Sequence, residues 1–179
     1  MVPFLFGMVV LPLCSLFHEC GHYLAALAFD AHPQLHWTFV SHSQQLTSAA
    51  RFCIKAGGPM MDFLCVAGGL VWLHRFRQRE IPSMAQWISF TLVQRALASI
   101  LGVQMLLSGS QVLPDEAAMS IVLGWSKWTL PCMLLLAWVA AFMAALRAIP
   151  RGYRLLSFVG VNLGGVFGCG LLSVVIARF

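Results

Sequence analysis

Five long apolar stretches constrain this chain more than any other feature of its sequence. Each has about 20 residues or more with few charged side chains, and an apolar helix of about 20 residues crosses a hydrocarbon core about 30 Å thick. The sequence therefore predicts an all-α polytopic membrane protein with about five transmembrane helices. We place these helices at residues 4–29, 52–73, 84–107, 129–149 and 155–177.

The composition favours the same class of protein. Hydrophobic residues make up 60% of the chain and charged residues only 9%, a balance unlike that of a soluble globular domain. The net charge of +5 is spread over short loops, which is typical of membrane topology rather than of a nucleic-acid-binding patch. We expect an integral, multi-pass protein of a lipid bilayer, such as the cell membrane, with no nucleic-acid partner.

The segments between the apolar stretches are short. Residues 31–51 are polar and lack helical periodicity, which favours a short β hairpin or loop at the membrane surface. Residues 117–125 are apolar but too few to cross a membrane, so we expect an interfacial helix there. No segment indicates a soluble domain, and we expect one transmembrane domain over residues 1–179.

Arginines gather in two loops, at residues 75–79 and 147–154. The positive-inside rule places both loops in the cytoplasm. The 30–51 and 108–128 segments then share the opposite side of the membrane, so the end of the first span and the start of the 108–128 segment can meet.

The first apolar stretch contains "HECGH" at residues 18–22. Residues four apart lie on one face of a helix, so His18 and His22 can bind the same metal ion. Glu19 is placed to act as a general base on water activated by that ion. Two histidines and a glutamate are costly in lipid without a partner, and a metal ion compensates all three. The motif predicts one Zn²⁺ per chain.

A catalytic zinc site usually has three protein ligands. Asp115 follows the third span on the side that faces the end of the first, which makes it the favoured third ligand. Asp62 lies within the second span and is the alternative, because an unpaired carboxylate there is costly. Glu116 adjoins Asp115 and can substitute for it.

Three segments together resemble the site-2 proteases, which are intramembrane zinc metalloproteases. "HECGH" matches the family's H-E-x-G-H motif, "GGPMMDFL" at 57–64 resembles its G-P-x-x-N stretch, and "LPDE" at 113–116 resembles its N-P-D-G stretch. The resemblance covers residues 4–120 as a protease-like core, and the helices within 129–177 add little to it.

The resemblance implies zinc on His18, His22 and Asp115, with Glu19 as the general base. It implies hydrolysis of peptide bonds in membrane proteins or membrane-associated peptides. Asp62 stands where the family has a polar Asn, and Glu116 replaces the Gly after the ligand Asp. Family members hold the zinc towards the cytoplasm, which is opposite to the side that the arginine loops predict.

Two other classes of protein remain as alternatives. "HECGH" and "HPQLH" at 32–36 both fit the H-x-x-x-H boxes of membrane di-iron desaturases and hydroxylases. Those sites use more histidines, whereas this chain has six, none after His74 and no adjacent pair. The third class is a non-catalytic membrane scaffold or transporter subunit, in which His and Asp make interhelical contacts or relay protons.

Overall fold

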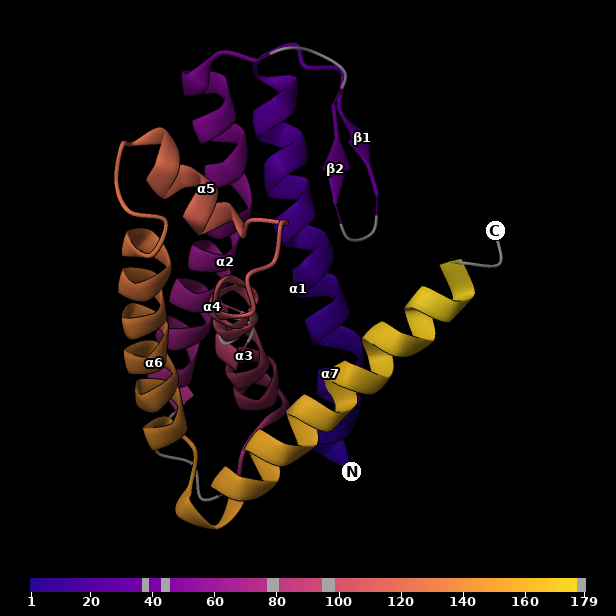
Figure 1. The fold of residues 1–179 in the computed structure, drawn as a ribbon. Helices are drawn as coiled ribbons and strands as arrows, with labels where there is room; N and C mark the ends of the chain where they lie inside the picture. The colour runs from indigo at the N-terminus through magenta and orange to yellow at the C-terminus, as the bar shows by residue number, and fades with distance from the viewer. Residues whose placement is uncertain (37–38, 43–45, 77–80, 95–98, 177–179) are drawn as a thin grey trace. The chain divides into compact units, whose positions relative to one another are not determined.

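The chain was analysed as a computed structural model that describes residues 1–36, 39–42, 46–76, 81–94 and 99–176 (Figure 1). Its elements are helices apart from one small pair of strands. In chain order they are α1 (Val2–Leu27), β1 (Gln34–Leu35), β2 (Val40–Ser41), α2 (Ser48–Phe76), α3 (Met84–Gln94), α4 (Ser99–Leu107), α5 (Asp115–Val122), α6 (Thr129–Ala148), the 3-10 turn η2 (Arg151–Tyr153) and α7 (Arg154–Ile176).

Five helical stretches of the described chain are long and apolar enough to cross a membrane. Four of these stretches correspond to one helix each, namely α1, α2, α6 and α7. The fifth, Met84–Leu107, includes α3 and α4. The predicted span at 84–107 also includes residues 95–98, which lie outside the described residues. The expectation of a helical fold with five long apolar helices is confirmed. The second helix begins earlier than expected because the Thr47 hydroxyl caps it, accepting a hydrogen bond of 3.2 Å from the Ala50 N–H.

The connecting segments also follow the predicted pattern. β1 pairs antiparallel with β2, with Gln34 opposite Ser41, so the polar stretch after the first helix contains the expected hairpin. The short helix expected at 117–125 is α5, which begins two residues earlier, at Asp115. This shift makes Asp115 the first residue of a helix instead of a loop residue.

The described chain forms two compact units. The first comprises Met1–Cys14, Cys65–Ala96 and Ala140–Phe179, and the second comprises Ser15–Leu64 and Leu97–Val139. The expected single transmembrane domain stays a prediction.

Glycines bring α7 close to the first half of α1 within the first unit (Figure 1). A side chain at Gly164 would overlap the backbone carbonyl oxygen of Phe4, and one at Gly168 would overlap that of Met8. The i, i+4 spacing puts both glycines on one face of α7. Small residues at this spacing let two helix backbones approach closely. In a membrane this close packing matters because lipid tails are as apolar as the helices, so the hydrophobic effect does not drive the helices together.

The second unit has its own close backbone contact, between the end of α1 and the start of α2. A Cβ at Gly21 would overlap the carbonyl oxygen of Gly57, and a Cβ at Gly57 would overlap that of Gly21. Ile54 of α2 is buried beside this contact in a cluster with Ala26 and Ala31. The two glycines therefore set how closely α1 and α2 approach in the unit that carries the "HECGH" segment.

We expect Gly164→Val to destabilise the first unit, because the new side chain meets backbone that cannot move aside. Forcing extra atoms into a packed contact costs about 1–3 kcal/mol. The measurement is the thermal unfolding midpoint in detergent. Gly170→Val is the matched control, since nothing lies within 4 Å of a Cβ at Gly170 on the same helix. Equal midpoints for the two variants would contradict the proposed role of the glycine contact.

Candidate metal centre

The histidines of the "HECGH" segment lie on one face of α1, one helical turn apart. Their rings are centred 4.8 Å from each other in an edge-on arrangement, and their Nε2 atoms are 3.2 Å apart. His22 is buried and His18 is half-buried. The i, i+4 spacing therefore directs two imidazole nitrogens to one point, as the sequence predicts.

Asp115, at the start of α5, brings a carboxylate to the same point. Its Oδ2 lies 2.9 Å from Nε2 of His22 and 3.4 Å from Nε2 of His18. His18, His22 and Asp115 form a group of potential metal ligands whose donor atoms all lie within 4.8 Å of one another. The three residues that the sequence favours are thus brought together within the second unit.

The distances within this group fit a tetrahedral metal ion. Zinc binds nitrogen and oxygen ligands at about 2.0–2.1 Å, so two ligands of a tetrahedral site are about 3.3 Å apart. The three separations between Nε2, Nε2 and Oδ2 are 3.2, 2.9 and 3.4 Å. A tetrahedral ion held by these three residues would keep its fourth position open, which is the arrangement of catalytic zinc sites.

The outer nitrogen of each ring is held by an oxygen atom. Nδ1 of His22 lies 2.6 Å from the carbonyl oxygen of Ile54, and Nδ1 of His18 lies 2.8 Å from Oδ2 of Asp62. The Gly58 N–H is also 3.3 Å from Nδ1 of His22, but a carbonyl oxygen only accepts, so we assign the proton to Nδ1. Both rings then donate Nδ1–H outward and present an Nε2 lone pair to the centre.

Asp62, the alternative third ligand, therefore occupies a different place from Asp115. It lies 2.8 Å from the nitrogen of His18 that faces away from the ligand group. A carboxylate in this position fixes the ring orientation and increases the basicity of the ligand nitrogen. Asp62 thus orients a ligand in this arrangement rather than supplying one.

The three acceptor atoms form a group that could hold a cation. With both Nδ1 atoms protonated, two imidazole lone pairs and a carboxylate oxygen face one another without a hydrogen between them. A positive charge at the centre would stabilise this arrangement, and the donor set suits a divalent transition metal.

A glycine of α2 keeps the centre of the group clear. A Cβ at Gly58 would overlap Nε2 of both His18 and His22. The sequence "GGP" therefore serves two purposes in the second unit, since Gly57 contacts the α1 backbone and Gly58 faces the two ligand nitrogens.

The two acidic residues at the start of α5 have opposite pKa shifts. Burial raises the pKa of Asp115, but the neighbouring His18 and His22 side chains and the charge of Lys55 outweigh it and hold that pKa well below its usual range. Burial raises the pKa of Glu116, and the charge of Asp115 adds to the increase. The shifts of the two neighbouring carboxyls therefore have opposite signs, and the carboxyl whose pKa is lowered faces the histidines.

Glu19, the expected general base, is half-buried on α1 directly after His18. Its position in the chain is the one that H-E-x-x-H chemistry requires.

Lys55 is a contact of this site that the sequence analysis did not identify. Its Nζ donates a hydrogen bond of 2.9 Å to Oδ1 of Asp115. The signal that could have found it is a lysine near the start of an apolar span, two residues before a Gly-Gly-Pro sequence.

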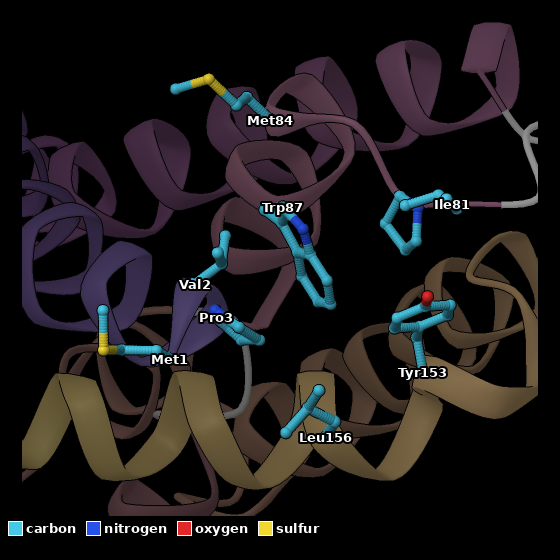
Figure 2. A pocket seen from close by; sticks show the side chains of 9 residues that line it. Met1, Val2, Pro3, Ile81, Met84, Trp87, Tyr153 and Leu156 are labelled. Carbon is cyan, nitrogen blue, oxygen red and sulfur yellow. The ribbon is translucent and has the colours of Figure 1, made fainter.

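The first unit contains a different feature, an open apolar pocket with a volume of about 360 Å³ (Figure 2). Its lining includes Met1, Met84, Leu156 and the aromatic pair Trp87 and Tyr153, whose ring centroids are 6.5 Å apart. No acidic, basic or histidine side chain is among its lining residues. The pocket therefore lacks the kinds of side chain from which the candidate metal centre is built.

Comparisons with known proteins found no matching family model, no similar curated protein and no similar solved structure.

We expect Gly58→Ala to abolish tight metal binding while the chain still folds. The added methyl meets the ends of two histidine side chains, which can rotate aside, so ligand geometry is lost rather than helix packing. The measurement is metal content per purified chain, with unfolding in detergent as the folding check. Gly68→Ala on the same helix is the control, because a Cβ there has nothing within 4 Å. Full metal content in Gly58→Ala would contradict the assignment of the site.

We expect Asp62→Asn to weaken metal binding by about 10- to 100-fold, the usual effect of losing such an outer partner. The amide can donate to Nδ1 of His18 and so favour the tautomer that places the proton on Nε2. The measurement is competition with a chelator of known affinity. Asp30→Asn makes the same chemical change at an exposed site and serves as the control; equal affinities for the two variants would show that Asp62 does not orient the ligand.

Proposed function

We propose that this protein is a multi-pass membrane protein that acts as an intramembrane zinc metalloprotease of the site-2 protease type. The observation that carries the proposal is the convergence of His18, His22 and Asp115. Two of these ligands come from an H-E-x-x-H motif, and the third comes from a segment 93 residues further along the chain. The resemblance of three segments to that family supports the same function.

The choice of zinc rests on the donors and on Glu19. Two imidazole nitrogens and one carboxylate oxygen suit zinc, although a similar set can hold a single ferrous ion. A glutamate directly after the first histidine is the general base of H-E-x-x-H hydrolases. A di-iron centre needs further ligands, and the described residues contain one group of three.

The chemistry is the hydrolysis of a peptide bond. Zinc, when bound, polarises the scissile carbonyl and lowers the pKa of water to about 7. His18, His22 and Asp115 hold the ion, and the oxygens of Asp62 and Ile54 keep the two rings oriented. Glu19 takes the proton of the attacking water and returns it to the leaving amine.

The position of the motif along α1 bears on access to the site. His22 precedes the last residue of α1, Leu27, by five residues, which is about 8 Å along a helix axis. We infer that the centre lies near one surface of the membrane, where water reaches it. Substrates are membrane proteins or membrane-associated peptides with a locally unwound segment, since a helical peptide bond is shielded from attack.

The first experiment measures metal identity and stoichiometry in the detergent-purified full chain. We expect about one zinc per chain, lost in His22→Ala because a ligand is removed. Two irons per chain would contradict the proposal in favour of a desaturase-like protein. The absence of any tightly held metal would contradict it in favour of a scaffold or transporter subunit.

Glu19→Gln separates catalysis from metal binding. We expect this variant to keep its zinc and lose cleavage of transmembrane peptides reconstituted with it in liposomes, because the amide cannot accept the proton of water. The measurement is product detection by mass spectrometry, with wild type as the reference. Cleavage at the wild-type rate by Glu19→Gln would contradict the assigned role of Glu19.

A further inference from the structure

We propose that Lys55 is a positioning residue, which holds one oxygen of Asp115 so that the other oxygen alone faces the metal ion. The inference rests on the metal centre proposed above. It assigns a function to a side chain that belongs to none of the motifs in the sequence.

The two oxygens of Asp115 have different partners. Oδ2 faces Nε2 of His22 at 2.9 Å, and Oδ1 accepts a hydrogen bond of 2.9 Å from Nζ of Lys55. A carboxylate can bind a metal ion through one oxygen or through both. Because the ammonium occupies Oδ1, Asp115 is limited to ligation through Oδ2, which preserves a four-coordinate site with one open position.

Lys55 acts from the same helix that orients the histidines. Ile54 accepts the Nδ1–H of His22, and Lys55, the next residue, holds Asp115. Asp62, two turns further along α2, holds His18. Each of the three ligands therefore has a partner on α2, and Lys55 is the partner of the only ligand that α1 does not supply.

The alternative is that Lys55 and Asp115 form an ordinary ion pair. The Lys55 side chain is 44% exposed, and exposed ion pairs contribute little to stability. The two possibilities differ in the coordination of a bound metal ion. An ion pair without a positioning function leaves the coordination number unchanged when Lys55 is replaced, whereas a positioning residue alters it.

The test is titration of the metal-stripped full chain with Co²⁺, whose visible absorption reports its coordination number. The variants are Lys55→Met, which keeps length and removes the charge, and Lys55→Arg, which keeps the charge. Arg51→Met is the matched control, because Arg51 also lies on α2, is exposed and donates to the carbonyl of Leu46 instead of to the site. Arg51→Met also removes one positive charge from α2, at a position one helical turn from Lys55.

We expect the wild type, Lys55→Arg and Arg51→Met to give the intense spectrum of four-coordinate Co²⁺. Lys55→Met is expected to give the weaker spectrum of a higher coordination number and about tenfold weaker binding, the low end of what loss of an outer partner costs. A wild-type spectrum and affinity in Lys55→Met would overturn the proposal while leaving the metal centre intact. No Co²⁺ binding by the wild type would overturn both the metal centre and this inference.

Discussion

The contact between Gly21 and Gly57 is the constraint on which the candidate site depends. Neither residue can carry a side chain without overlapping the other helix's carbonyl oxygen. The resulting proximity lets the Ile54 carbonyl and the Asp62 carboxylate reach the outer nitrogens of His22 and His18. A larger residue at either glycine would separate the helices, and both rings would lose the partners that orient them.

The proposed metal site draws on three helices of the second unit. α1 carries two candidate ligands, α5 carries the third, and α2 carries a hydrogen-bonding partner for each of them. Gly58 of α2 also keeps the space between the two Nε2 atoms clear. Outer partners of this kind determine tautomer and orientation, so α2 is as important to the site as the helices that carry the ligands.

Much of the fold, and the meeting of His18 with His22, could be predicted from local sequence. Span positions follow from the lengths of apolar stretches, and the convergence of His18 and His22 follows from the i, i+4 geometry of a helix. The sequence favoured Asp115 over Asp62 from their places along the chain, but the histidine nitrogen that each carboxylate faces could not be predicted in this way. Both are carboxylates near the same histidines, and only packing determines which nitrogen each one faces. Lys55 was missed for the same reason, since its partner lies 60 residues away.

The spacing of the ligands along the chain affects biosynthesis. The two histidines and the α2 residues that orient them have all been made once the chain has reached Asp62, but the third candidate ligand follows only at Asp115. During translation, at about 5–20 residues per second, the growing chain therefore passes through a period of seconds with a two-histidine site. In the proposed function, a metal ion that bound in this period would lack its carboxylate ligand, so tight retention would begin only when α5 has folded onto the rest of its unit.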